Sequence, residues 1–155
     1  MTGNNAERLR QTVSAAAGRL RSLGDADASV KPSPTRWSKK EILGHLIDSA
    51  SNNHQRFVRA LQQGELRFPP YEQEGWARCQ DYQTADWRVL IELWRAYNEH
   101  LAHVIARIPA DRLATPCRIG DGDAVTLGWL VEDYQRHLDH HVAQLDRRVT
   151  AATPL

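Results

Sequence analysis

The sequence predicts an all-α protein built as a four-helix bundle. Four segments of roughly 20 residues or more carry apolar side chains at spacings of three and four, and no segment shows the strict alternation typical of a strand. A chain of 155 residues is long enough for one continuous core, so we expect a single domain over 1–155. Amphipathic helices of this length bury their apolar faces most simply by packing as a bundle.

The first two helices are expected over 4–23 and 38–63. The first repeats apolar residues on one face (Leu9, Val13, Ala16, Leu20 and Leu23). The second has the clearest start in the chain, because Ser38 and Glu41 have the spacing of a capping box, flanked by Trp37 and Ile42 at the spacing of a hydrophobic staple. Gly64 is the expected end of this helix.

The third and fourth helices are expected over 86–108 and 126–148, the former ended by Pro109 and the latter capped by Thr126. The apolar face of the third includes Leu90, Leu93, Trp94, Tyr97, Leu101, Val104, Ile105 and Ile108. The intervening loops are long, at 24–37, 64–85 and 109–125. The middle loop could stretch about 70 Å, twice the length of about 35 Å of a 23-residue helix. It could therefore cross the whole bundle, and consecutive helices need not alternate in direction.

Composition excludes several classes of function. Net charge is +1 with both signs interspersed, which gives no reason to expect a nucleic-acid partner or an anionic membrane. The chain opens on a polar stretch and has no apolar run of membrane-spanning length, and Cys79 and Cys117 fit no paired motif. We therefore expect reduced thiols in a cytoplasmic protein that acts on a small molecule. Long amphipathic helices and several tryptophans favour a homodimer, with a monomer as the alternative, over a larger assembly.

Three histidines are the candidate metal ligands. On the fourth helix, His137 and His141 replace aliphatic residues in the stripe Leu127, Leu130, Tyr134, Leu145, one turn apart. His45 lies on the buried face of the second helix, beside Leu46. Three buried imidazoles could instead be bonded to nearby carbonyls or hydroxyls, but a divalent ion would give each a reason to be inside. His140 falls with Asp133, Arg136 and Gln144 on the polar face. His54, His100 and His103 are weaker candidates, and His100 looks exposed.

Three polar residues continue the face of the second helix on which His45 lies. Ser49, Asn52 and Arg56 follow His45 at i+4, i+7 and i+11, which is typical of either a substrate-binding wall or a solvated helix edge. Asp48 and Asp133 are expected to point away from the ligands. Trp37, Trp94 and Trp129 fit packing, and Trp76 in the middle loop is also expected to pack, with a pocket as the alternative.

The motifs resemble those of the DinB/YfiT-like superfamily. The likeness rests on residues 37–49 (Trp-Ser-x-x-Glu-x-Leu-Gly-His-Leu-x-Asp-Ser) and 126–145 (Thr-Leu-Gly-Trp-Leu-Val-Glu-Asp-Tyr-x-x-His-x-x-His-His-x-x-Gln-Leu). It implies an up-down-down-up four-helix bundle, with His45, His137 and His141 holding one divalent ion, nickel or zinc.

The resemblance also implies a range of activities. The superfamily includes transferases and isomerases that use low-molecular-weight thiols such as mycothiol, bacillithiol or glutathione, as well as hydrolases and stress-response proteins. Some thiol-dependent relatives carry a carboxylate where this chain has His137. With no evident general base beside the ligands, we expect a thiol-dependent transferase with an open metal site, the alternatives being a metal-dependent hydrolase and a non-catalytic metal-binding protein.

Overall fold

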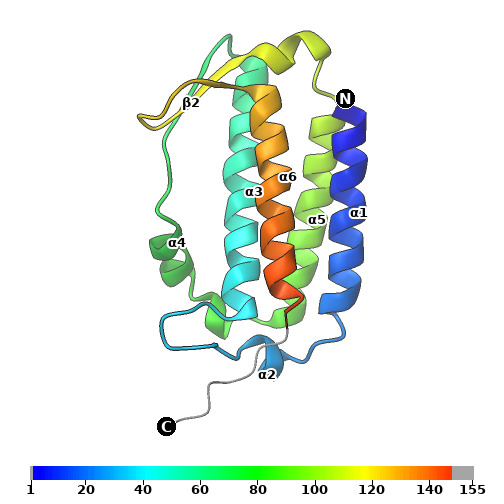
Figure 1. Ribbon diagram of the computed structural model, residues 1–155, viewed down its shortest axis with the longest axis vertical. Helices are drawn as coiled ribbons and strands as arrows, with labels where there is room; N and C mark the ends of the chain where they lie inside the picture. The colour runs from blue at the N-terminus through cyan, green and yellow to red at the C-terminus, as the bar shows by residue number, and fades with distance from the viewer. Residues whose placement is uncertain (1, 148–155) are drawn as a thin grey trace.

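The computed structural model describes residues 2–147 and confirms the four-helix bundle (Figure 1). The four long helices are α1 (Thr2–Leu20), α3 (Lys39–Gln62), α5 (Trp87–Ala106) and α6 (Leu127–Leu145). The expected end of the fourth helix at 148 and both ends of the predicted domain lie outside the described residues. No helix within 2–147 has the length and apolarity needed to cross a bilayer.

The predicted helix starts are confirmed by their caps. Ser38 and Glu41 form the expected capping box of α3. The side chains of Asp86 and Thr126 accept the backbone N–H groups of Val89 and Trp129, at the first turns of α5 and α6. Each cap satisfies a backbone donor that the helix itself leaves unpaired, which fixes where the helix begins.

The helices run up-down-down-up, as the resemblance implied. In Figure 1, α1 and α6 descend while α3 and α5 ascend, so the consecutive helices α3 and α5 are parallel neighbours. The chain between them must return along the full length of the bundle, as the length of the 64–85 segment allowed. This crossing segment is not a bare loop, because it contains β1 (Leu66–Phe68), α4 (Gln73–Gln80) and a 3-10 turn (Tyr82–Thr84).

The expectation of no strands was wrong. β1 pairs in parallel with β2 (Pro116–Ile119), which pairs antiparallel with β3 (Val125–Thr126). These strands are too short to show alternation, and the paired residues of β1 and β2 are 51 positions apart in the sequence, with Leu66 opposite Cys117. The small sheet ties the crossing segment to the connection before α6.

The core fills the space between the four long helices and contains most of the predicted apolar stripes. Trp94, Leu101 and Ile105 of α5 are buried, but Leu93 is 48% exposed and Trp129 is 44% exposed, contrary to expectation. Leu93 lies just outside the apolar face of α5 that packs against α1 and α3. The Trp129 ring instead lies beside the Arg136 guanidinium, 5.3 Å from its carbon to the ring centre.

Gly44 brings the crossing segment close to α3. A Cβ added at Gly44 would lie 2.1 Å from the Tyr82 ring, so only glycine allows this contact. The Tyr82 hydroxyl then donates to Asp48 Oδ1 at 2.6 Å. This close approach holds the 3-10 turn against the helix that carries His45.

Candidate metal centre

His45 sits at the centre of the candidate site and is fully buried. Its ring lies 5.2 Å from that of Trp37, the residue before the capping box, so the cap and the ligand are positioned together. Its Nε2 points at Nε2 of His137 across the α3/α6 interface, 3.0 Å away. Two imidazole lone pairs at this distance repel each other unless a proton or a cation lies between them.

His137 and His141 complete the group from α6. Their ring centres are 4.6 Å apart, and that of His141 is 4.8 Å from that of His45. Within residues 2–147, only these three side chains bring three potential ligand atoms within 4.8 Å of one another. His140 is exposed and bonds to Gln144, as its place on the polar face predicted.

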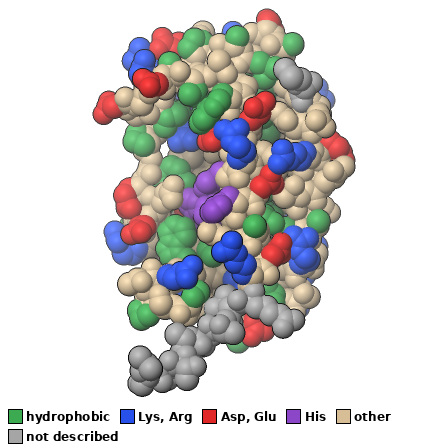
Figure 2. All heavy atoms as spheres, in the orientation of Figure 1, with side chains coloured by type: hydrophobic (Ala, Val, Ile, Leu, Met, Phe, Trp, Pro, Cys, Tyr) green, Lys and Arg blue, Asp and Glu red, His purple; other side chains and the backbone are tan. Residues whose placement is uncertain are grey.

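The burial of the two α6 histidines differs from expectation. Both are half-buried, while the buried face of α6 runs through Leu138 and Val142. The apolar stripe is therefore rotated by one position, which places His137 and His141 at its edge. Histidine side chains accordingly reach the surface in a hollow of the face shown in Figure 2. A site at the edge of the core can be entered from solvent.

Two oxygen atoms orient the α6 imidazoles from behind. Gln144 Oε1 lies 2.8 Å from Nδ1 of His141, and Ser49 Oγ lies 3.4 Å from Nδ1 of His137. An amide oxygen can only accept, so His141 carries its proton on Nδ1 and presents Nε2 as the free donor atom. This is the arrangement expected around metal-binding histidines. The sequence placed Gln144 on the polar face and so missed this role.

The protonation of the group suits a cation. The pKa of His45 is lowered to about 3, mainly by burial and in addition by the nearby His137 and His141. Burial likewise lowers the pKa of His137 to about 4, with His141 adding to the shift and Asp133 opposing it. The pKa of His141 is also lowered by burial, against the hydrogen bond to Gln144. All three are therefore neutral near pH 7, the form that binds metal, and the donor set fits a divalent transition ion.

The predicted substrate-binding residues occupy three different settings. Ser49 is buried behind His137, as described. Asn52 is buried, donates from Nδ2 to the Asp48 carbonyl, and borders a neighbouring pocket. Arg56 is half-buried, its guanidinium carbon 5.6 Å from the centre of the Phe68 ring. None of the three lies on a fully solvated helix edge.

Arg56 is a cation without an anionic partner among the described residues. Its nearest hydrogen-bonding partner is Asn53 Oδ1 at 3.5 Å, and its buried Nε has none. Burial lowers its pKa, while Tyr71 and Asp133 oppose that change. A partly desolvated guanidinium without a carboxylate partner is suited to hold a carboxylate or another anion.

Asp48 is close to the site but is not one of the converging ligands. The carboxylate is buried, its Oδ1 accepts from Tyr82 and Gln80, and its Oδ2 has no partner within the described chain. Burial raises its pKa, and the two hydrogen bonds oppose the rise. The expectation that Asp48 points away from the histidines agrees with its absence from their group, but its burial was not foreseen.

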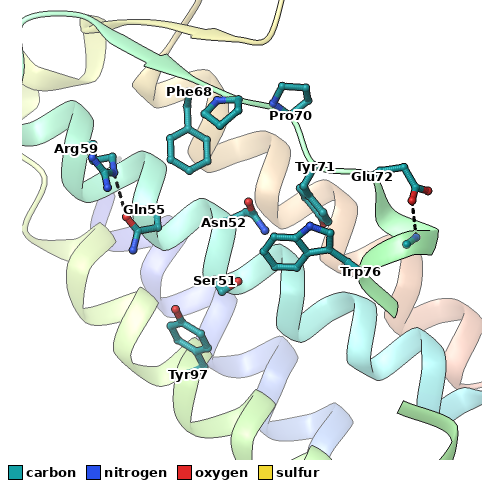
Figure 3. A pocket seen from close by; sticks show the side chains of 12 residues that line it. Ser51, Asn52, Gln55, Arg59, Phe68, Pro70, Tyr71, Glu72, Trp76 and Tyr97 are labelled. Atoms are coloured by element: carbon teal, nitrogen blue, oxygen red, sulfur yellow. Dashed lines mark hydrogen bonds between the residues drawn. The ribbon is translucent and has the colours of Figure 1, made fainter. Parts of the chain in front are cut away.

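A pocket of about 600 Å³ lies beside this centre, between α3, α5 and the crossing segment (Figure 3). Trp76 and Tyr71 line it with their rings 5.1 Å apart, and Asn52 lies on the α3 side. Trp76 is 40% exposed and lines this pocket, so the alternative to a packing role is the one observed.

The fold and the three-histidine group together define a helical-bundle protein with a candidate metal centre. A sequence profile described as the DinB superfamily matches residues 8–145, and the chain therefore belongs to that superfamily.

Relatives of known sequence share a provisional designation as metal-dependent hydrolases. One from Halalkalibacterium halodurans is 24% identical over 111 residues, which cover 72% of this chain and 64% of the relative. One from Oceanobacillus iheyensis is 20% identical over 109 residues, covering 70% and 63%. The chain thus spans slightly less than two thirds of the length of these two relatives.

Two solved structures share the fold. YfiT from Bacillus subtilis, described as a probable metal-dependent hydrolase with an unusual four-helix bundle topology, superposes with a TM-score of 0.83 at 20% identity. The match covers 97% of this chain and 89% of YfiT. A mycothiol-dependent maleylpyruvate isomerase superposes with a TM-score of 0.76 at 14% identity, covering 97% of this chain and 62% of the isomerase. At these identities the likeness establishes the architecture.

Proposed function

We propose that this chain is a metal-dependent enzyme in which His45, His137 and His141 hold one divalent ion, nickel or zinc. The observation that carries the proposal is the convergence of the three neutral imidazoles, with 3.0 Å between Nε2 of His45 and of His137. The provisional designation of the relatives as metal-dependent supports it. Since no acidic or thiol side chain within 2–147 joins the group, coordination positions remain for small molecules.

The favoured reaction is transfer of a small-molecule group involving a low-molecular-weight thiol. A bound divalent ion would supply Lewis acidity and a preference for sulfur in its thiolate form. Arg56 would hold an anionic group of the substrate or thiol, because it has no carboxylate partner of its own. Asn52 would contribute its free amide oxygen, and the crossing segment with Trp76 would limit the entry of water.

Hydrolysis is the second candidate, favoured by the designation of the relatives. It would be helped by a general base close to the ligands. Asp48 is the nearest buried carboxylate on α3, but two hydrogen bonds hold its Oδ1 toward Tyr82 and Gln80. This arrangement is why thiol chemistry is preferred. A metal-binding protein without catalysis is the remaining alternative.

The test uses protein purified without a metal-affinity step. Elemental analysis should find about one divalent ion per chain, and cobalt substitution should give a visible spectrum that mycothiol, bacillithiol or glutathione perturbs. Arg56→Ala should weaken this perturbation while leaving the cobalt content unchanged. A cobalt spectrum that no thiol alters would favour hydrolysis, and protein that takes up no divalent ion would refute the proposal.

A further inference from the structure

The pocket beside the metal centre presents aromatic rings from several elements to one space. Phe68 comes from β1, Tyr71 and Trp76 from the crossing segment, and Tyr97 from α5 (Figure 3). Trp76 leaves 40% of its surface exposed. Large rings left open on a concave surface gain free energy when a ligand covers them, and they favour other flat rings by stacking.

The α3 side of the pocket is polar, but most of its groups are already bonded. The Ser51 hydroxyl and the Asn52 amide nitrogen both donate to the Asp48 carbonyl. The Gln55 carbonyl oxygen accepts from Arg59 at 3.0 Å. What remains for a ligand is the Asn52 oxygen and the Gln55 amide nitrogen. Such a small number of polar groups orients a mainly apolar ligand and does not suit a heavily hydroxylated one.

The charges around the pocket favour an anion. Arg59 is one of its lining residues, and the Arg56 guanidinium lies over the ring of Phe68, another lining residue. Neither guanidinium forms an ion pair within residues 2–147. The negative charge of Glu72, which also lines the pocket, is held by the backbone N–H groups of Glu74 and Gly75 at the start of α4. This region therefore has two arginines without ion-pair partners and one carboxylate whose charge is already balanced by two hydrogen bonds.

The pocket and the candidate metal centre have no residue in common, but α3 contributes to both. Asn52 lines the pocket and lies two turns from His45 on α3. Tyr71 lines the pocket too, and the pKa of its phenol is raised to about 12, mainly by burial, with Asp48 adding to the shift and Arg56 opposing it. Because the Arg56 guanidinium lies over Phe68, a ligand in the pocket whose charged end passes this ring would reach Arg56.

We propose that this pocket binds an aromatic carboxylate, with its ring against Trp76 and Tyr71 and its carboxylate at Arg56. The proposal rests on the proposed function for the role of the bound molecule, which is that of the substrate positioned at the metal. The binding itself depends on the aromatic rings and the arginine, not on the ion. It can therefore be measured on metal-free protein.

The experiment is calorimetric titration of metal-free full-length protein with 2-naphthoate, benzoate and cyclohexanecarboxylate. Cyclohexanecarboxylate is the matched control for benzoate, because it has the same charge and nearly the same size but no π face. We expect benzoate to bind about tenfold more tightly than cyclohexanecarboxylate, and 2-naphthoate more tightly still. Trp76→Ala and Arg56→Gln should each weaken 2-naphthoate binding by about tenfold.

Trp129→Ala is the control variant, because Trp129 is exposed to a similar degree but lies away from the pocket. It should leave 2-naphthoate binding unchanged. Equal affinity for benzoate and cyclohexanecarboxylate, or an unchanged affinity in Trp76→Ala, would overturn the proposal. Repeating the titration with zinc-loaded protein separates the two ideas: aromatic binding in a chain that takes up no metal refutes the proposed function alone, and metal uptake without aromatic binding refutes the pocket alone.

Discussion

The bundle contains two groups of three histidines, and only one has the features of a metal site. His45, His137 and His141 meet between α3 and α6, whereas His54, His100 and His103 meet between α3 and α5. Ring spacing barely separates them, since the centres of His54 and His100 are 5.0 Å apart and those of His45 and His137 are also 5.0 Å apart. The difference lies in where the nitrogen atoms point and in what holds them.

In the second group the nitrogen atoms are directed elsewhere. His54 Nδ1 is 3.2 Å from the Tyr97 hydroxyl, and His103 Nε2 accepts from Arg107 at 3.1 Å. His100 and His103 are exposed, so neither is held by packing. In the first group, oxygen atoms behind His137 and His141 leave their Nε2 atoms facing His45. What distinguishes a candidate metal site is that ring nitrogen atoms point at one position and that hydrogen bonds to the opposite ring nitrogen atoms hold them there. Proximity of the rings matters less.

The largest expected effect is the loss of metal when the first group is broken. His137→Ala should lower the affinity for zinc by at least about 100-fold, because it removes one of three ligands. Zinc competition with a chromophoric chelator measures this change. His140→Ala is the matched control on the same helix, one turn from His137, and should bind zinc almost as the wild type does. Equal losses in both variants would mean that the ion sits elsewhere.

The metal-free protein should lose stability as the pH falls. The folded pKa values of about 3 for His45 and about 4 for His137 lie below the unfolded value of about 6.5. The unfolded chain therefore takes up these protons first, and the free energy of unfolding decreases between about pH 7 and pH 4, by on the order of a few kcal/mol. The half-exposed His137 contributes less than its pKa alone suggests, because solvent screens it.

Urea unfolding in a chelator at several pH values tests this prediction. His45→Asn should flatten the dependence on pH, whatever it does to the stability at pH 7. His54→Asn should flatten it less, because the lowered pKa of His54 reflects only partial burial, helped by the charge of His100. A pH dependence equally steep in wild type and His45→Asn would contradict the account.

A smaller effect is expected from the residues behind the ligands. Gln144→Ala removes the acceptor of His141 Nδ1 and should weaken zinc binding by about tenfold, since the ring is then free to change its tautomer and orientation. Gln144→Glu keeps an acceptor and should retain most of the affinity. Tyr97→Phe removes the corresponding partner of His54 and serves as the control in the second group. If Gln144→Ala binds zinc like the wild type, the hydrogen bond from His141 Nδ1 to Gln144 is not needed to orient the His141 ring.

The sequence predicted the parts of this comparison that depend on local pattern. The starts of α3 and α6 follow from caps at Ser38 and Thr126, and the three ligand candidates follow from helical spacing. Periodicity placed His137 and His141 inside the stripe, because it does not fix the rotation of α6 to within one residue. Their half-buried position depends on packing against α1 and α3.

Other features depend on contacts between distant segments and have no local signal. The parallel pairing of β1 with β2 joins residues 51 positions apart, Leu66 with Cys117. The aromatic pocket exists only because the crossing segment returns along α3, so Trp76 looked like a packing residue in the sequence. Gln144 lies on the polar face by its spacing, and its contact with the ring nitrogen of His141 is visible only in three dimensions.

The smallest expected effect belongs to the second histidine group. Replacing His54, His100 and His103 together with alanine should leave one zinc ion per chain and the affinity of the first site unchanged. Three physical reasons combine. Exposed side chains lose rotamer entropy when an ion fixes them, the free nitrogen atoms do not converge, and the Arg107 guanidinium 3.1 Å from His103 Nε2 repels a cation. Isothermal titration with zinc would show a second equivalent of similar affinity in the wild type, lost in the triple variant, if ring proximity alone were sufficient to make a site.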